Sequence, residues 1–281
     1  MNRALANALF FITGSGRAIG PGPRPGLRLL SRPQPGPRRN RILKERGRQD
    51  RQTRCFLMRN NIAIDGPAGA GKSTIAKKVA KAVSAIYVDT GAMYRAMALH
   101  MIRNGIDPED AAAISRQCRS ADITIEYIDG EQAVILNGEN VNAFLRREEV
   151  GNMASRSSVN PDVRTKLMEL QRQLAARTDV VMDGRDIGTV VLPDARVKIY
   201  LTASAEVRAK RRFDELAAKG QPADYDTIFN EIRDRDYRDM HREIAPLKQA
   251  EDAVLVDTSD MTIDEVADRI LEIYREKTGK A

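Results

Sequence analysis

The chain alternates between short apolar runs and segments in which apolar residues recur at helical spacing. Such runs are typical of strands that are covered on both faces of a parallel sheet. The expected strands are Ile62–Ile64, Ala85–Asp89, Asp179–Asp183, Val197–Leu201 and Val254–Asp257. Strands that alternate with helices predict a doubly wound α/β fold, here a five-stranded parallel sheet with helices on both faces.

The helices are predicted from apolar stripes and from residues that start or stop a helix. Five helices are expected at about 75–83, 90–103, 140–160, 204–219 and 224–243. Three more are expected to begin at Pro108, at Pro161 and at the capping box Thr262–Glu265. In the second helix, Met93, Met97 and Met101 recur at helical spacing, which predicts that they fill the core.

Residues 122–138 have a different pattern. Ile123, Ile125 and Tyr127 alternate with polar residues, and apolar residues alternate again after Asp129–Gly130. This pattern predicts an antiparallel hairpin with its turn at Asp129–Gly130. We expect the hairpin to belong to a small inserted subdomain at about 120–158.

Charge is distributed unevenly along the 281 residues. Of the 46 Lys and Arg residues, 13 lie in residues 1–57, which hold only two of the 39 acidic residues. The rest of the chain therefore carries 33 basic and 37 acidic residues. The net charge of +7 belongs to the N-terminal extension, and we expect no specific nucleic-acid partner for the body of the chain.

The extension 1–57 is rich in Pro, Gly and Arg, and we expect it to be disordered. It could be a targeting peptide with an apolar stretch at Ala4–Ile12, or a basic arm that binds anionic polymers. A third interpretation makes Met58 the functional start. We favour the third, because the first predicted strand begins within a few residues of Met58.

Several classes of protein are disfavoured by the sequence. No uncharged apolar run is long enough to cross a bilayer. Cys55 and Cys118 have neither disulfide nor metal-ligand spacing, and His100 and His241 are far apart. We expect a cytoplasmic monomer without a membrane partner, in a reduced compartment that contains ATP.

Residues Gly66–Ser73 fit the G-x-x-x-x-G-K-[ST] pattern of a P-loop. Its glycines permit backbone conformations in which successive N–H groups face a phosphate. Lys72 would place its charge near the β- and γ-phosphates, and the Ser73 hydroxyl suits Mg²⁺ as a ligand. The flanking strand and helix place the phosphates at a helix N-terminus, which a chance glycine-rich turn would not do. The residues predicted to bind ATP are Gly66, Pro67, Ala68, Gly69, Ala70, Gly71, Lys72, Ser73 and Thr74.

Other polar residues follow the strands. Asp183 closes an apolar strand, as a Walker-B-type aspartate does, and Arg185 suggests an anionic acceptor beside the metal. Two further arginine groups, Arg208 with Arg211 and Arg212, and Arg235 with Asp239 and Arg242, each share a helix face. Spacing alone favours a solvated, salt-bridged surface for both groups. The segment 213–233, with Gly220 and Pro222, is the predicted helical lid that excludes water.

Taken together, four motifs resemble those of bacterial cytidylate kinases. They are Ile64–Thr74, Asp89–Arg95, Asp183–Thr189, and Arg235–Asp239 with Ala245–Leu247. The P-loop is shared with many enzymes, whereas the second and third motifs together are far more specific. The resemblance covers Met58 to the C-terminus, including the hairpin, and residues 1–57 have no counterpart in the family. Thr90 stands where a serine is common.

The resemblance implies transfer of the γ-phosphoryl group of ATP to CMP or dCMP, with Mg²⁺. It implies that Lys72, Asp183, Arg185 and Arg242 act in catalysis, the last near the transferring phosphate. Arg95 and Arg185 would hold the acceptor phosphate, Arg235 and Asp239 the sugar, and Ser155, Arg164 and Asp186 the base, with Asp89 and Thr90 at the acceptor site.

The chemistry of cytosine agrees with these roles. Its N4 amine suits a carboxylate such as Asp186, and its O2 and N3 acceptors suit an arginine or a hydroxyl. Uracil has the opposite pattern at position 4, so Asp186 would reject it. Without the resemblance, Ser155 and Arg164 read as helix surface.

Two alternatives remain open. Another small-molecule P-loop kinase, acting on UMP, AMP or shikimate, would contain the same loop. A nucleic-acid-binding protein would use the basic extension, with the kinase fold incidental.

Overall fold

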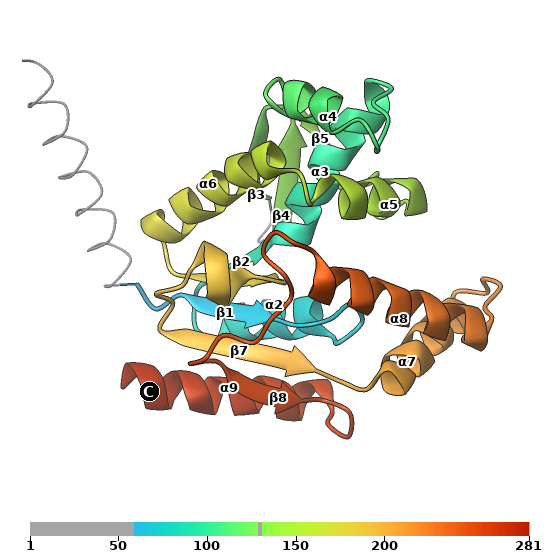
Figure 1. Ribbon diagram of the computed structural model, residues 1–281. Helices are drawn as coiled ribbons and strands as arrows, with labels where there is room; N and C mark the ends of the chain where they lie inside the picture. Colours follow the sequence, from blue (N-terminus) through green and yellow to red (C-terminus); the bar gives the residue numbers. More distant parts are fainter. Residues whose placement is uncertain (1–58, 129–130, 281) are drawn as a thin grey trace, which may run out of the picture. The chain divides into compact units, whose positions relative to one another are not determined.

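The computed structural model describes residues 59–128 and 131–280 (Figure 1). Its larger sheet has five parallel strands in the order β2-β6-β1-β7-β8. These are β1 (Ile62–Asp65), β2 (Ile86–Asp89), β6 (Val180–Gly184), β7 (Val197–Thr202) and β8 (Val254–Asp257). The predicted doubly wound five-stranded sheet is confirmed.

Helices cover both faces of this sheet because alternate residues of each strand point to opposite sides. Ile62 and Ile64 of β1 belong to a core shared with α2 (Lys72–Ala82) and α9 (Ile263–Thr278). Ala63, between them, belongs to the opposite core, shared with α3 (Thr90–Arg103) and α6 (Pro161–Arg177). Every residue of β1 is therefore buried, and the strand carries the P-loop on a rigid support.

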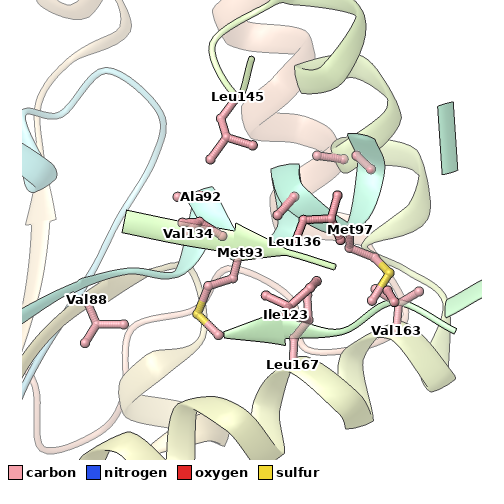
Figure 2. Packing of buried hydrophobic residues seen from close by; sticks show 14 of the residues in the cluster. Val88, Ala92, Met93, Met97, Ile123, Val134, Leu136, Leu145, Val163 and Leu167 are labelled. Carbon is pink, nitrogen blue, oxygen red and sulfur yellow. The ribbon is translucent and has the colours of Figure 1, made fainter. Parts of the chain in front are cut away.

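A second, three-stranded antiparallel sheet confirms the predicted hairpin. It consists of β3 (Ile123–Ile128), β4 (Glu131–Leu136) and β5 (Glu139–Asn140), in that order. The proposed turn at Asp129–Gly130 lies outside the described residues. Figure 2 shows Ile123 and Leu136 of this sheet around Met97 of α3. Met93, Met97 and Met101 are fully buried, which confirms them as core residues.

Two helix predictions are wrong. The helix expected from Pro108 is α4 (Ala111–Cys118), which begins three residues later because the Asp110 side chain accepts from Ala113 N at 2.8 Å and caps it. The helix expected over 140–160 is only α5 (Glu148–Ser157). Before it, residues 139–142 pair with β4: Asn140 belongs to β5, Val141 N donates to the Val134 carbonyl, and the Asn142 side chain accepts from Val134 N.

A helical hairpin follows β7. It consists of α7 (Ala205–Ala218) and α8 (Tyr225–His241), and the break expected at Gly220–Pro222 lies between them, where Gly220 has a left-handed φ of 66°. An edge-on contact joins Phe213 of α7 to Tyr225 of α8, and Tyr225 in turn stacks on Phe229 within α8. That this segment closes as a lid stays a prediction.

The remaining sequence predictions concern chain limits and membrane segments. The extension 1–57, with Cys55, lies outside the described residues, as does Met58. Within the described ranges, no helix is both long and apolar enough to span a bilayer.

The N-terminus of α6 generates a prediction about stability. The buried Asn160 side chain accepts from Asp162 N and Val163 N and donates to Ala111 O, so it joins α6 to α4. Asn160→Ala should lower the free energy of unfolding by about 2–3 kcal/mol, since it removes a cap and also the side-chain bonds to Ala111 O and Ser115 Oγ of α4. The exposed cap Thr262→Ala, which joins no second helix, should cost about 1 kcal/mol. Urea denaturation measures both, and equal losses would contradict this reading of Asn160.

Candidate active site

The P-loop turns sharply between β1 and α2. A Cβ at Gly66 would lie 1.9 Å from the carbonyl oxygen of Leu201, so only glycine lets the loop leave the sheet here. Gly71 precedes α2 with a left-handed φ of 84°, and no side chain within residues 59–128 and 131–280 caps the helix. The first N–H groups of α2 therefore remain available to an anion, as expected for phosphate binding.

Lys72 lies inside this loop. Its ammonium group is buried and donates to the carbonyl oxygen of Pro67 at 2.6 Å. Burial and the charge of Arg185 lower the pKa of Lys72, whereas the carboxylates of Asp183 and Asp65 oppose that shift. An anionic ligand at the loop would give this partly desolvated cation a partner.

Asp183 connects the P-loop to the end of β6. Its carboxylate accepts from the Ser73 hydroxyl at 3.0 Å and from the Tyr87 hydroxyl at 2.9 Å. Burial, followed by the charge of Asp89, raises the pKa of Asp183 to about 6. The structure thus pairs the predicted metal ligand Ser73 with the Walker-B-type aspartate.

The donor set fits Mg²⁺. Among the described residues no group of three or more acidic, His or Cys side chains could enclose a metal ion. Ser73 and Asp183 offer hard oxygen atoms at one place, and Mg²⁺ is held in such sites by one or two protein oxygens together with water and phosphates.

Three residues predicted for the acceptor site lie where β2 meets α3. The Asp89 carboxylate accepts from Ala92 N at 2.8 Å, which caps α3, and from Arg95 at 3.2 Å. The Thr90 hydroxyl donates to the backbone oxygen of Asp183 at 2.7 Å, which joins the start of α3 to the end of β6. Among the residues that the structure describes, the buried Nε atom of Arg95 has no hydrogen-bond partner.

Arg185 lies between the end of β6 and α8. It donates to the Asp239 carboxylate at 2.8 Å and to the Gly184 carbonyl at 3.3 Å. Burial would raise the pKa of Asp239, but the charge and hydrogen bond of Arg185, with Arg235 and Arg242, lower it on balance. Asp239 is therefore an anion held against one of the predicted phosphate-binding cations.

Asp186 is held by two arginines. Arg164 of α6 contacts one carboxylate oxygen, and Arg242 donates to the other at 3.3 Å. All three side chains are less than 10% exposed. Arg242 also donates to the Ala245 carbonyl at 2.6 Å. Arg164 is thus a buried ion-pair partner and not the helix surface that spacing alone suggested.

Two predicted residues are not tied to this network. Ser155 is a half-buried residue of α5, and among the described residues its hydroxyl has no hydrogen-bond partner. Arg235 is exposed on α8 and forms no ion pair with a described residue, although its charge acts on Asp239. Their roles stay predictions.

Comparison with known proteins identifies the family. Residues 62–276 match the family described as cytidylate kinase. The chain belongs to the cytidylate kinase family. A cytidylate kinase from Caldicellulosiruptor bescii is 51% identical over 76% of this chain and 95% of its own, and one from a Geobacillus strain is 50% identical over 79% and 100%. A solved shikimate kinase from Acinetobacter baumannii is 18% identical over 81% and 99%, with a TM-score of 0.38, too low to add to the argument.

Sequence reasoning missed Asp65, which ends β1. Its carboxylate accepts from Ile187 N at 2.8 Å and Gly188 N at 2.7 Å, and burial raises its pKa to about 6 despite these bonds. Asp65 thereby fixes the π-helical turn η1 (Ile187–Val191) directly after Asp186. The sequence signal that could have identified Asp65 is its position at the end of a predicted strand, directly before Gly66 of the P-loop.

Arg208 also differs from its sequence interpretation. It is buried, pairs with Asp236 at 2.6 Å, and donates to the P-loop carbonyl of Ala68 at 3.0 Å. The solvated surface favoured by spacing is correct for Arg212, which pairs with exposed Glu215, and wrong for Arg208. Arg208 therefore links the P-loop to α7 and, through Asp236, to α8.

The raised pKa of Asp183 predicts how stability depends on pH. Because its folded-state pKa of about 6 exceeds the ordinary 3.8, the folded protein binds more protons between these values, and stability falls as pH rises through them. Asp183→Asn removes that loss, which is on the order of 2–3 kcal/mol.

The ligand-free variant should therefore melt about 4–12 °C above the wild type at pH 7.5, and by less than half of that margin at pH 4.5. Calorimetry at both pH values measures the difference. A variant that melts lower than the wild type at pH 7.5 would contradict the assignment.

Proposed function

We propose that this protein transfers the γ-phosphoryl group of ATP to CMP or dCMP, giving CDP or dCDP, in pyrimidine nucleotide metabolism. The observation that carries the proposal is family membership over residues 62–276, at about 50% identity to relatives named cytidylate kinase. The network around Asp183, Arg185 and Asp186 gives the proposal a physical basis.

The donor side is assigned to Gly66–Thr74. Its N–H groups and Lys72 would bind the phosphates of ATP, and Ser73 with Asp183 would hold Mg²⁺. Mg²⁺, when bound, neutralises charge on the phosphates. Binding of ATP would draw Lys72 away from the Pro67 carbonyl, since a phosphate is the stronger partner.

The acceptor side is assigned to the cations around the ends of β2 and β6. Arg95 and Arg185 would hold the acceptor phosphate, and Arg242 would stabilise the phosphoryl group in transit. Each now pairs with an acidic residue or a carbonyl, which keeps these flexible side chains close to their working positions. Asp239 and Arg235 would bind the sugar.

Base recognition is assigned to Asp186, with Arg164 and Ser155. The two arginines fix the Asp186 carboxylate from both sides, so it would present an acceptor to the N4 amine of cytosine in one orientation. The O4 of uracil would face the same oxygen atoms without a hydrogen, which is the basis of the expected discrimination.

The setting is also a proposal. We place the reaction in the cytoplasm, where ATP is available and the buried free thiol of Cys118 stays reduced. We propose that the protein acts as a monomer and does not need a nucleic-acid partner.

The first test is a panel of acceptors with ATP and Mg²⁺. CMP and dCMP should be phosphorylated with a kcat/KM at least a hundredfold above that for UMP, AMP or shikimate, as different hydrogen-bonding edges allow. A coupled assay for ADP measures each. Preferential phosphorylation of AMP or UMP would refute the proposal.

A second test addresses Asp186. Asp186→Asn keeps the shape but supplies an amide that can donate to uracil O4, so the CMP-to-UMP ratio of kcat/KM should fall at least tenfold, as expected for one recognition contact. KM for ATP should change less than threefold. Because Arg164 and Arg242 lose an ion partner, melting temperature is measured in parallel. An unchanged ratio in a folded variant would contradict base recognition by Asp186.

A further inference from the structure

β2 is an edge strand of the parallel sheet, and its outer edge is available to other parts of the chain. Ile86 N donates inward to the Asp179 carbonyl at 2.9 Å. In a parallel strand the polar groups of alternate residues point to opposite edges, so the peptide groups of Tyr87 and Asp89 face outward. Unpaired groups at such an edge are a liability unless another segment satisfies them.

Two side chains of the inserted sheet bond the Tyr87 carbonyl and both polar backbone groups of Asp89. The Tyr127 hydroxyl donates to the Tyr87 carbonyl at 2.9 Å. The Gln132 carboxamide accepts from Asp89 N at 2.8 Å and donates to the Asp89 carbonyl at 3.3 Å. Tyr127 and Gln132 are directly opposite each other in the β3–β4 register. One cross-strand pair thus takes the place that a further strand would occupy.

The residue held by Gln132 is also the residue that holds Arg95. The Asp89 carboxylate caps α3 and accepts from Arg95 at 3.2 Å. The backbone of Asp89 is fixed outward by Gln132, and its side chain reaches the arginine assigned to the acceptor phosphate. A displacement of the Asp89 peptide group would therefore move the partner of Arg95.

We propose that Gln132 is a positioning residue for the acceptor phosphate site, acting through Asp89 on Arg95. The inference rests on the proposed function, which assigns Arg95 to the acceptor. A carboxamide is suited to this role because it combines a donor and an acceptor in one planar group, matching the N–H and C=O of one residue. Tyr127 covers the edge of β2 but does not contact Asp89, since its hydroxyl bonds to the Tyr87 carbonyl.

The test compares Gln132→Met with Tyr127→Phe. Gln132→Met keeps the length of the side chain and removes both bonds to Asp89, whereas Tyr127→Phe removes one bond from the same edge and leaves Asp89 untouched. Gln132→Met should raise KM for CMP about tenfold and leave KM for ATP within twofold of the wild type. Tyr127→Phe should leave both KM values within twofold.

Amide exchange gives a readout that does not depend on turnover. The Asp89 amide should exchange faster in Gln132→Met than in the wild type or in Tyr127→Phe, because its acceptor is lost. A KM for CMP within twofold of the wild type in folded Gln132→Met, or an equal rise for ATP and CMP, would overturn the inference. Wild-type protein that fails to phosphorylate CMP would instead overturn the proposed function.

Discussion

The site depends on carboxylates buried at the carboxyl ends of parallel strands. Asp65 and Asp183 end neighbouring strands β1 and β6, and burial raises the pKa of both to about 6. A buried carboxylate requires donors, and those available here are two backbone amides of η1 for Asp65 and two hydroxyl groups for Asp183. Satisfying these acids therefore positions the segment after Asp186 and the Ser73 hydroxyl. At neutral pH the buried carboxylates of Asp65 and Asp183 lower the stability of the folded protein, but as anions they suit a cationic ligand.

A second layer of charge surrounds these acids. Arg185 pairs with Asp239, and Asp186 pairs with Arg164 and Arg242. Because the partners come from the turn after β6, from α6, and from the C-terminal end of α8, each pair also joins segments that are distant in sequence. Buried pairs of this kind contribute little net stability, since desolvation opposes attraction, but breaking one leaves an uncompensated charge. In the proposed function their value is preorganisation: Arg185 would be oriented before an acceptor phosphate binds, and Asp186 before a base does.

The sequence predicts most of the sheet and the P-loop, because strand burial and glycine geometry are local properties. Asp183 and Arg185 could be chosen since they follow a recognisable strand. Arg208 was misjudged because helical spacing cannot show that one side of α7 faces the P-loop. Gln132 and Tyr127 gave no signal at all, since their partners are backbone groups about 40 residues away. The helix expected over 140–160 is shorter because residues 139–142 pair with β4 through backbone and side-chain bonds, which helical spacing cannot show.

The inserted sheet covers the outer edge of β2, which the parallel sheet itself leaves unpaired. A doubly wound sheet necessarily has two edge strands, and here one of them, β2, ends at Asp89, at the acceptor side. Covering that edge with another parallel strand would need a crossover helix, which would occupy space beside α3. An antiparallel hairpin needs only a short turn and contributes two side chains instead of a strand. The same contacts that protect the edge then fix Asp89, so protection of the sheet and placement of Arg95 follow from one arrangement.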